Sequence, residues 1–444
     1  MNPKIIVLDD DPTGSQTVHS CLLLTRWDVV TLKAALVDTS PLFFVLTNTR
    51  GMDAARAAAV TREVCENLRI ALRDHAGPVL FVSRSDSTLR GHYPVETDIM
   101  NEVLGPFDAT ILAPVFFEGG RITRDGTHYL VTDGRPVPAH ETEFARDSVF
   151  GYTTAFLPDY IAEKTGGRVA ADHVARLGLA DLRAGGADAW LGALSGNAVG
   201  VVDGESPDDY AIFADAALKA VAAGKRLLFR SAASLLTALA KLPPQLIAAE
   251  SFATLVEDER PGAVVVGSHV AKTTSQLATL LKQPGVVGLP LDVARLPKER
   301  TAVAGELVAG AAQAHAQGLT PIIFTSRAEL HFPSAAERLS FGEVVSATLM
   351  DVVKRLPPTL GFLVSKGGIT SNDVLSTGLG LTASRVLGQI LPGVTVVTTP
   401  ADHRLPHLPV VIFPGNVGAE DALAETYRRL VPSRARPSPA TLAA

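Results

Sequence analysis

The sequence predicts an α/β protein of two domains, each a mainly parallel sheet flanked by helices, with its active site in the inter-domain cleft. Three observations predict this fold. Short apolar runs alternate with amphipathic segments along the chain, as in βαβ units. The runs are continuous, as in strands buried on both faces. Most of them end in polar turns that contain glycine, and open α/β sheets bind ligands beyond the carboxyl ends of their strands.

Composition limits the classes of protein that fit this fold. The 444 residues suffice for two domains with substantial cores. A net charge of -6 is modest for this size and argues against nucleic acid as the main partner. Cys21 and Cys65 form no paired or metal-binding pattern, so we expect reduced packing residues in a cytoplasmic protein. The chain opens on a strand and no apolar run has transmembrane length, so we expect neither a signal peptide nor a membrane partner.

The domain boundaries follow from proline and charge. We expect a first domain at residues 1–245, a second at residues 260–431 and a flexible tail at residues 432–444. The connection between the domains is marked by prolines and is partly acidic, and the tail is rich in Pro, Ser, Arg and Ala. Residues 121–160 are polar and rich in loop-forming residues. We expect them to form an excursion that covers the site rather than a packed βα unit.

The first domain opens on the apolar run Lys4 to Leu8, followed by three aspartates at 9–11. Three adjacent carboxylates repel one another unless a cation, a hydroxyl-rich ligand or backbone donors receive them. An acidic surface turn is the alternative. Further strands are predicted at 41–46, 79–82 and 109–114, then at 199–202 and 226–230.

The helix expected after residue 53 shows how the first domain buries its apolar surface. Asp53 is its predicted N-cap. Four apolar residues spaced four apart predict its buried stripe: Val60, Val64, Leu68 and Leu72.

The strand ends of the first domain carry charged and hydroxylated side chains. They are the carboxylates of Asp10, Asp11 and Asp86, the guanidinium groups of Arg50, Arg84 and Arg90, and the hydroxyls of Ser83, Ser85, Ser87 and Thr88. Guanidinium groups bind carboxylates through two hydrogen bonds, and aspartates accept hydrogen bonds from sugar hydroxyls. The set therefore predicts a pocket for a small, hydroxylated, anionic molecule. The alternative is that Arg84 and Arg90 only neutralise the acidic groups.

Three predicted strands of the second domain end in glycine turns, at Gly267-Ser268, Gly367 to Thr370 and Gly415 to Gly418. Glycine lets backbone N–H groups approach phosphates, and a following helix N-terminus favours negative charge. Three such turns in one domain predict a polyphosphate cradle, although no Walker A pattern is present. The glycines at 378–383 resemble a dinucleotide fingerprint but follow no predicted strand. Helices are expected at 273–281, 302–316 and 341–356.

Two further patterns have competing interpretations. Asp9 to Thr13 fits the Asp-x-Asp-x-Thr motif of phosphatases that form an aspartyl phosphate. That chemistry also needs a later lysine and metal-binding acids, and the first domain offers no convincing lysine. His403 and His407 have a four-residue spacing, but Pro406 and Pro409 disrupt a ligand-bearing helix, which favours structural histidines over a zinc site.

Together these segments resemble the four-carbon acid sugar kinase family over residues 4–430. The resemblance lies in DDDPTG with Ser15 and Thr17, SRSDSTLRG, APVFFEGGRITRDG, HETEFARD, VVGSHV, SKGGIT and PGNVGAEDAL. It implies an N-terminal acid-sugar-binding domain and a C-terminal ATP-binding domain. It also implies ATP-dependent phosphorylation of a hydroxyl of a small sugar acid, such as threonate, erythronate, 3-oxo-tetronate or 3-oxo-isoapionate.

The resemblance also implies roles for individual residues. The expected catalytic residues are Asp10 and Asp11, and the expected substrate-binding residues are Arg50, Arg84, Ser85, Asp86, Ser87 and Arg90. The expected nucleotide-binding residues are Ser268, Gly367, Gly368, Ile369, Thr370, Gly415, Asn416, Val417 and Gly418. Many members have ADDLTGA in place of DDDPTGS, lysine in place of Arg84, and Lys-Ser-Gly-Gly-Phe-Gly in place of the turn at 414–418. These departures leave the particular sugar acid open.

The expected mechanism places the sugar acid in the first domain and ATP with Mg²⁺ in the second, with metal ligands that the sequence does not identify. Either Asp10 or Asp11 orients the attacking hydroxyl and accepts its proton, or contacts the metal. Two other functions stay open, an aspartyl-phosphate phosphatase and a non-catalytic sugar-acid-binding protein. A homodimer is one assembly open to the chain.

Overall fold

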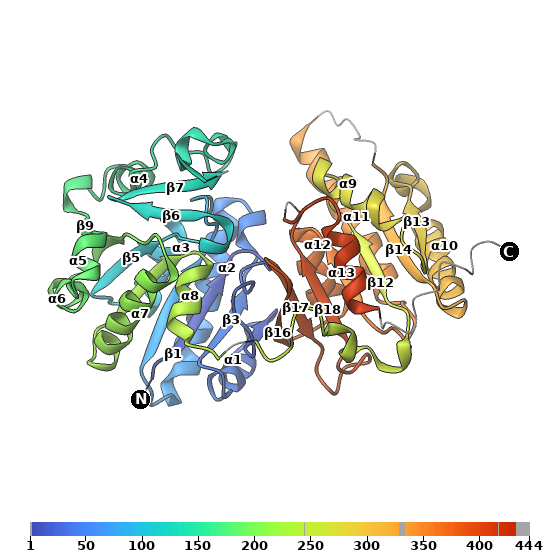
Figure 1. Ribbon diagram of the computed structural model, residues 1–444, viewed down its shortest axis with the longest axis horizontal. Helices are drawn as coiled ribbons and strands as arrows, with labels where there is room; N and C mark the ends of the chain where they lie inside the picture. Colours follow the sequence, from blue (N-terminus) through green and yellow to red (C-terminus); the bar gives the residue numbers. More distant parts are fainter. Residues whose placement is uncertain (1, 133, 244, 328–333, 416, 432–444) are drawn as a thin grey trace. The chain divides into compact units, whose positions relative to one another are not determined.

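The computed structural model describes residues 2–132, 134–243, 245–327, 334–415 and 417–431, and these form two compact units, Met1–Pro243 and Pro244–Ala444 (Figure 1). The tail expected at 432–444 and the site residue Asn416 lie outside the described residues. In the described part of the chain, no helix combines the length and the apolar character that a bilayer crossing requires.

The first unit contains a sheet of eight parallel strands, and it confirms the predicted parallel architecture. In spatial order the strands are β2 (Leu22–Leu24), β3 (Leu42–Leu46), β1 (Lys4–Asp9), β4 (Val79–Arg84), β11 (Leu227–Ser231), β5 (Ala109–Ala113), β10 (Ala198–Val202) and β9 (Ala175–Leu177). Every residue of β3, β5 and β11 is buried, as continuous apolar runs in a covered sheet require.

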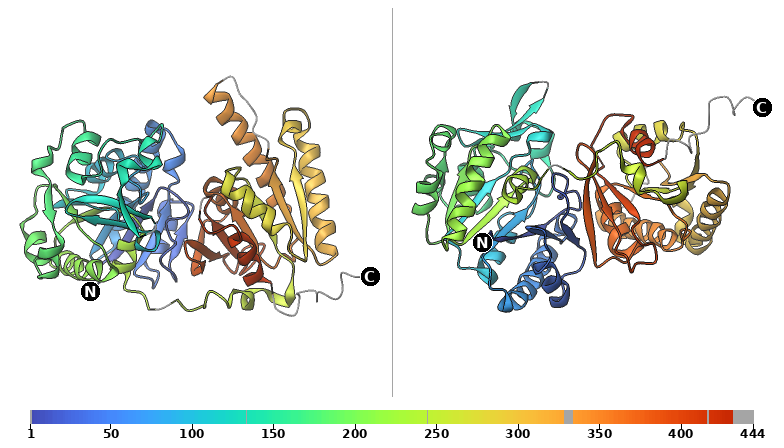
Figure 2. Two further views of the ribbon diagram at one scale, coloured as in Figure 1. Left: turned by 45° about the horizontal axis from the view of Figure 1, so that its top comes forward. Right: turned by 60° about the horizontal axis from the view of Figure 1, so that its bottom comes forward.

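Helices of the first unit lie on both faces of this sheet (Figure 2). Adjacent helices on one face are α1 (Val29–Leu36), α2 (Ala54–Ala71) and α3 (Val95–Leu104). A second group of neighbours is α5 (Leu179–Arg183), α6 (Ala187–Ala193), α7 (Pro207–Ala222) and α8 (Ala233–Ala240).

Helix α2 confirms Asp53 as the N-cap, since its side chain accepts a hydrogen bond from the Arg56 backbone N–H at 2.8 Å. Two of the four residues predicted to form the buried stripe are not fully buried. Val64 and Leu68 are buried, but Val60 and Leu72 are only partly buried. A strict four-residue spacing drifts around a helix of 3.6 residues per turn, and the buried face follows a mixed spacing instead. It consists of Ala57, Thr61, Val64, Cys65, Leu68 and Ala71.

Residues 121–160 are more regular than a loop-rich excursion. They form a separate antiparallel sheet of β6 (Arg121–Arg124), β7 (Thr127–Thr132) and β8 (Arg135–Pro138), followed by helix α4 (Leu157–Lys164). The signal that was overlooked is Asp125-Gly126. Both residues have positive φ, 51° and 75°, as the two-residue hairpin between β6 and β7 requires. The Thr123 N–H donates to Gly204 O at 3.0 Å, which joins this small sheet to the end of β10.

The second unit has its own mainly parallel sheet. Five parallel strands come first in spatial order: β13 (Val286–Leu291), β14 (Thr320–Thr325), β12 (Ala263–Val266), β15 (Leu363–Lys366) and β18 (Pro409–Phe413). Two antiparallel strands follow, β17 (Val394–Thr398) and β16 (Ala383–Leu391). A π-helical turn at Val374–Gly378 precedes β16, so no strand leads into the glycines at 378–383, as expected.

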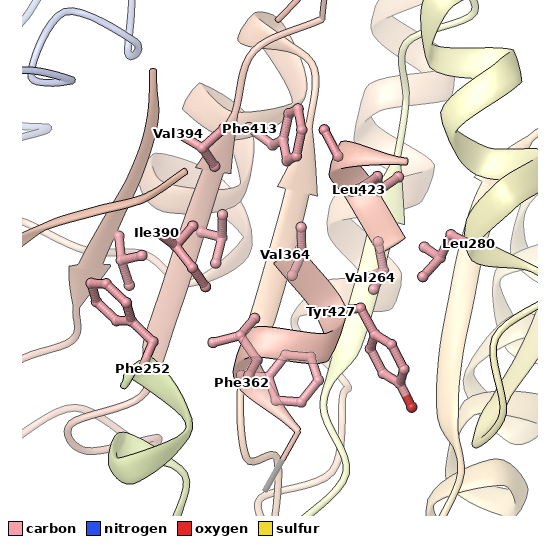
Figure 3. Close-up of a cluster of buried hydrophobic side chains, with 14 of the residues drawn as sticks. Phe252, Val264, Leu280, Phe362, Val364, Ile390, Val394, Phe413, Leu423 and Tyr427 are labelled. Carbon is pink, nitrogen blue, oxygen red and sulfur yellow. The ribbon is translucent and has the colours of Figure 1, made fainter. Parts of the chain in front are cut away.

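The helices of the second unit are α9 (Ala271–Leu280), α10 (Leu296–Ala316), α11 (Ala335–Val353), α12 (Gly368–Asp373) and α13 (Ala422–Leu430). The first three begin two to six residues before their predicted starts, because polar first turns carry no apolar periodicity. Helices α9 and α13 pack side by side over the sheet. The core beneath them includes Val264 and Phe413 from the strands, and the Phe362 and Tyr427 rings lie 6.3 Å apart (Figure 3).

Candidate functional site

The three aspartates at the end of β1 are held by two arginines. Arg50 donates from Nε to Asp10 Oδ2 at 3.2 Å, from Nη2 to Asp10 Oδ1, and from Nη1 to Asp11 Oδ2 at 3.4 Å. The buried Arg84 donates from Nη1 to Asp9 Oδ1 at 3.2 Å. The structure therefore brings Arg50, Arg84 and the acids together, but it uses both arginines to neutralise carboxylates within the protein.

Asp10 and Asp11 differ in their access to a ligand. Asp10 is 2% exposed, and Ser85 Oγ donates to its Oδ2 at 2.5 Å in addition to the contacts from Arg50. The Asp11 side chain is 21% exposed. Its Oδ1 accepts from the Thr13 backbone N–H at 2.8 Å and from Thr13 Oγ1, while among the described residues its Oδ2 has only the long contact from Arg50. Asp11 Oδ2 is therefore the carboxylate oxygen of this cluster that is open to a further donor.

The charge state of Asp11 follows from its neighbours. Burial alone would raise the pKa of this carboxyl, but the Arg50 and Arg84 charges and the hydrogen bonds from Thr13 outweigh burial and hold the pKa below its usual value. Asp11 is thus ionised at neutral pH and can accept a hydrogen bond.

Asp9 has a different environment. It is fully buried, and among the described residues its Oδ2 has no hydrogen-bond partner. Burial raises its pKa to about 7, against the opposing charge of Arg84. Gly14 lies directly over the carboxylate, since a Cβ at that position would be 1.9 Å from Asp9 Oδ2. A phosphoryl group could not reach Asp9 without displacing this turn, which argues against Asp9 as a phosphatase nucleophile.

The turn after β4 carries the other expected substrate-binding residues. Asp86 accepts hydrogen bonds from Arg90 Nε at 2.8 Å and from Thr88 Oγ1. Burial opposes ionisation of Asp86, but the Arg50 and Arg90 charges lower its pKa to about 2. Ser85 Oγ lies 3.0 Å from Arg90 O, which closes the turn on itself.

Three consecutive carbonyls of this turn accept hydrogen bonds from buried side chains of the segment after β6. His128 Nε2 lies 2.8 Å from Ser87 O, Tyr152 OH donates to Thr88 O at 2.8 Å, and Tyr160 OH donates to Leu89 O at 2.8 Å. We call these three side chains the carbonyl clamp.

The clamp histidine is neutral, because burial lowers its pKa to about 4. A carbonyl can only accept a hydrogen bond, so the proton is on Nε2, and Nδ1 accepts from Thr123 Oγ1 at 3.0 Å. The clamp supports a strained backbone, since Leu89 has φ 66°.

Arg90 links the same turn to the residues after β8. Its guanidinium lies 5.0 Å from the centre of the Phe144 ring, and Nη1 lies 3.6 Å from Asp147 Oδ2. The segment HETEFARD therefore contacts the turn after β4 through Arg90.

Sequence analysis missed Arg230, which lies near the end of β11 beside this turn. Its Nη1 donates to Glu96 Oε2 at 2.7 Å and to Ser83 Oγ at 2.8 Å. Arg230 and Ser231 line a pocket together with Ser85 and Arg90. A run of apolar residues that ends in Arg-Ser at a predicted strand end was the available signal.

In the second unit the three glycine turns come together, because β12, β15 and β18 are adjacent and parallel. Thr273 Oγ1 donates to Gly415 O at 2.9 Å and lies 3.1 Å from Ser268 Oγ. Gly367 has φ 118°, and a Cβ there would lie 3.1 Å from Ser268 Cβ. These turns form one backbone surface, and a side chain at Gly367 would be strained there by its positive φ and crowded against Ser268.

The remaining predicted residues of this region surround the same surface. A Cβ at Gly267 would lie 2.2 Å from Thr370 Oγ1, and Ile369 is largely exposed. Gln276 Nε2, from α9, donates to Val417 O at 2.9 Å. A Cβ at Gly418 would lie 3.5 Å from the same nitrogen.

Two cations beside this surface were missed in the sequence. Lys366, at the end of β15, is fully buried, and its Nζ donates to Pro414 O and to Gly415 O and lies 4.2 Å from the centre of the Phe413 ring. Burial, with a smaller contribution from Lys272, lowers its pKa to about 7. Arg327 Nη1 donates to Ser268 O at 2.7 Å. Lys366 stands in SKGGIT, directly before Gly367, but was not chosen as a site residue, and Arg327 belongs to none of the quoted motifs.

The described residues offer no group of three His, Cys, Asp or Glu side chains that could hold a metal ion. His403 Nε2 lies 2.8 Å from Leu379 O, and its Nδ1 accepts from the Leu405 N–H at 3.1 Å. Both ring nitrogens are thus used by the backbone, which agrees with the structural interpretation of this histidine.

The comparisons with known proteins agree with this division of the chain. The family profile described as "Sugar-binding N-terminal domain" matches residues 5–239, and the profile described as "Nucleotide-binding C-terminal domain" matches residues 263–423. The fold and its two sites thus define a two-domain protein with a sugar-binding half and a nucleotide-binding half. The chain belongs to the four-carbon acid sugar kinase family, as its motifs indicate.

Two curated relatives carry kinase names. The chain is 30% identical over 167 residues to the D-erythronate kinase of Heliobacterium modesticaldum, a match that covers 36% of each protein. It is 32% identical over 164 residues to the D-threonate kinase of Bordetella bronchiseptica, which covers 35% of this chain and 38% of that protein. The chain therefore matches little more than a third of the length of either relative.

Solved structures support the fold alone. A crystal structure of a Salmonella typhimurium LT2 protein has a TM-score of 0.68 at 20% identity and covers 96% of this chain and 98% of that one. The Haemophilus influenzae protein HI1011 has a TM-score of 0.64 at 17% identity, with 96% and 100% covered.

Proposed function

We propose that this protein is an ATP-dependent kinase that phosphorylates a hydroxyl of a small sugar acid of the threonate, erythronate or 3-oxo-tetronate type, or of 3-oxo-isoapionate. The observation that carries the proposal is the pairing of two kinds of site in one chain. The first unit presents carboxylates, guanidinium groups and hydroxyls at its strand ends, and the second unit presents a backbone surface shaped by three glycine turns. The family and the kinase names of two relatives support it.

In this proposal Asp11 accepts the proton of the attacking hydroxyl. It is preferred over Asp10 because its Oδ2 is open, whereas both oxygens of Asp10 are engaged by Arg50 and Ser85. Arg50 fixes the two carboxylates relative to each other and keeps Asp11 ionised. Asp10 then acts as a positioning residue, holding Ser85 against the acid cluster.

The residues of the second unit suit a nucleotide. Backbone N–H groups of the turns at 267–270 and 367–370 would bind phosphate oxygens, and a side chain at Gly367 would be strained and crowded against Ser268. Arg327 and Lys366 would supply positive charge near the phosphates. ATP supplies the phosphoryl group that is transferred to the hydroxyl.

A magnesium ion is not assigned a site on side chains of this protein. Within the described ranges the side chains provide no dedicated metal site, and Mg²⁺ in phosphoryl-transfer enzymes is held largely by phosphates and water. No step of the proposed mechanism is therefore assigned to a metal ligand of this chain.

The test is an ADP-release assay with the full chain across a panel of C4 and C5 aldonates and their oxo derivatives. We expect ATP-dependent turnover with at least one C4 acid. Phosphate release from a phosphorylated substrate without ATP would favour the aspartyl-phosphate phosphatase. Binding of a sugar acid with no ADP release across the whole panel would favour the non-catalytic binding protein.

A further inference from the structure

The pocket beside the turn after β4 is lined by Arg230, a buried arginine that uses one of its three guanidinium nitrogens for hydrogen bonds within the described residues. Arg230 is 7% exposed, and its Nη1 is engaged by Glu96 and Ser83. Among the described residues, its Nε and Nη2 have no hydrogen-bond acceptor. The edge formed by Nε and Nη2 is the side of a guanidinium that binds both oxygens of a carboxylate at once.

A second, independent observation lies next to this arginine. Ser231 is 3% exposed, lines the same pocket, and its Oγ is buried with no hydrogen-bond partner in the part of the chain that the structure describes. A buried hydroxyl without a partner is costly, by about 1–3 kcal/mol, so native proteins usually satisfy it. A ligand oxygen in the pocket would accept from it.

Gly91 keeps the space beside these donors open. A Cβ at Gly91 would lie 2.6 Å from Arg230 Nη2 and 2.3 Å from Ser85 Oγ. The pocket is small, with a cavity volume of about 20 Å³. Its lining also includes Asp86 and Arg90, which form an ion pair with each other, and apolar groups such as Leu112. Arg230 and Ser231 thus line a small pocket that has both polar and apolar walls.

We propose that this pocket is the carboxylate subsite of the protein, in which Arg230 binds the two carboxylate oxygens of the sugar acid and Ser231 donates a third hydrogen bond. The proposal rests on the proposed function for the identity of the ligand. It differs from the expectation that Arg50 and Arg84 hold the acid, because both of those groups are already bound to aspartates.

The subsite also orients the substrate. Ser85 lines the pocket and donates to Asp10, and Arg50 joins Asp10 to Asp11. A sugar acid whose carboxylate lies against Arg230 therefore extends its carbon chain toward Asp11. The hydroxyl far from the carboxylate becomes the phosphate acceptor, and the subsite selects acids over neutral polyols.

The experiment measures binding by calorimetry, without ATP, of the best C4 aldonate and of its aldonamide, in which a neutral amide replaces the carboxylate. Arg230→Lys keeps a cation beside Glu96 but removes the two-pronged edge, and Ser231→Ala removes only the unpartnered hydroxyl. We expect the aldonate Kd to rise about 10-fold or more in Arg230→Lys and about 3- to 10-fold in Ser231→Ala. The aldonamide Kd should change by less than about 2-fold in both variants.

Ser40→Ala is the matched control, because Ser40 Oγ is also buried without a partner in the described residues but lies outside the pocket. It should leave both dissociation constants unchanged. Equal weakening of aldonate and aldonamide, or no change in Ser231→Ala and Arg230→Lys, overturns the subsite. Carboxylate-dependent binding that responds to the variants, with no ATP-dependent turnover, supports the subsite and counts instead against the proposed kinase activity.

Discussion

The two candidate sites are built in opposite ways. At the end of β1 the site is made of side chains that hold one another, with Arg50 between Asp10 and Asp11 and Ser85 against Asp10. In the second unit the surface is made of backbone, and side chains such as Thr273 and Lys366 serve mainly to fix carbonyl groups. If the proposed function holds, the first arrangement would distinguish one ligand from another by its functional groups, whereas the second would bind phosphates, which are common to all nucleotides. Variants in the two sites should therefore fail in different ways.

The largest effect is expected at the first site. Asp11→Asn keeps the shape of the side chain but removes the proton acceptor, so turnover should fall by about 10²-fold or more. The measurement is kcat in the ADP-release assay, with Asp74→Asn, an exposed carboxylate paired with Lys33, as the control. Turnover equal to that of the unmodified protein would remove Asp11 from the mechanism.

At the second site we expect a loss of nucleotide binding that leaves the first site intact. Ser268→Ala combined with Gly367→Val places a side chain 3.1 Å from the Cβ of residue 268 and onto a backbone of positive φ. The Kd for ATP should rise by about 10-fold or more, while calorimetry still detects binding of the sugar acid. Gly305→Val is the control, because a Cβ there meets no atom within 4 Å. Unchanged ATP affinity would show that the nucleotide lies elsewhere.

The carbonyl clamp should affect the first site in a graded way. Tyr152→Phe and Tyr160→Phe each keep the ring but lose the hydrogen bond to the substrate-binding turn, which is worth about 1 kcal/mol. We expect KM for the sugar acid to rise about 3- to 10-fold with KM for ATP unchanged. A purely structural role would instead lower the melting temperature and leave both constants unaltered in the protein that remains folded.

The smallest effect concerns pH and the second site. Lys366 loses its proton above about pH 7, and phosphates favour its protonated form, so nucleotide binding above pH 7 must take up a proton. The Kd for ATP should rise about 3- to 10-fold between pH 7 and pH 9. Lys366→Met should remove most of this slope, measured by calorimetry in buffers of different ionisation enthalpy. A slope that persists in Lys366→Met would assign the titration to another group, such as Lys272, whose charge contributes to the lowered pKa of Lys366.

Much of the fold could be predicted, because strands such as β1 and β3 are buried on both faces and appear in the sequence as continuous apolar runs. The small sheet was missed because its strands are short and partly exposed, although Asp125-Gly126 marked its first hairpin. Strand order is what joins the three glycine turns, and strand order is set by tertiary packing rather than by local pattern.

In the candidate site, too, local patterns in the sequence predicted some residues and missed others. Motifs led to Asp10, Asp11 and the turn after β4, which the structure does bring together. They did not lead to Arg230, because one charged residue at the end of an apolar strand has no spacing to recognise. Lys366 was not chosen as a site residue although it stands in SKGGIT, directly before Gly367. They also could not show that Arg84 faces Asp9 rather than Asp86, since which carboxylate an arginine meets depends on neighbouring strands.

The clamp on Ser87, Thr88 and Leu89 separates two tasks along the chain. The acids that would carry out the chemistry are at the end of β1. The carbonyl clamp, which supports the neighbouring turn after β4, comes from a segment inserted between β5 and β9. Changes of sequence in that insert can therefore remodel which molecule is accepted without altering the reactive carboxylates. Relatives with divergent inserts but the same aspartates would be the natural place to look for new ligand preferences.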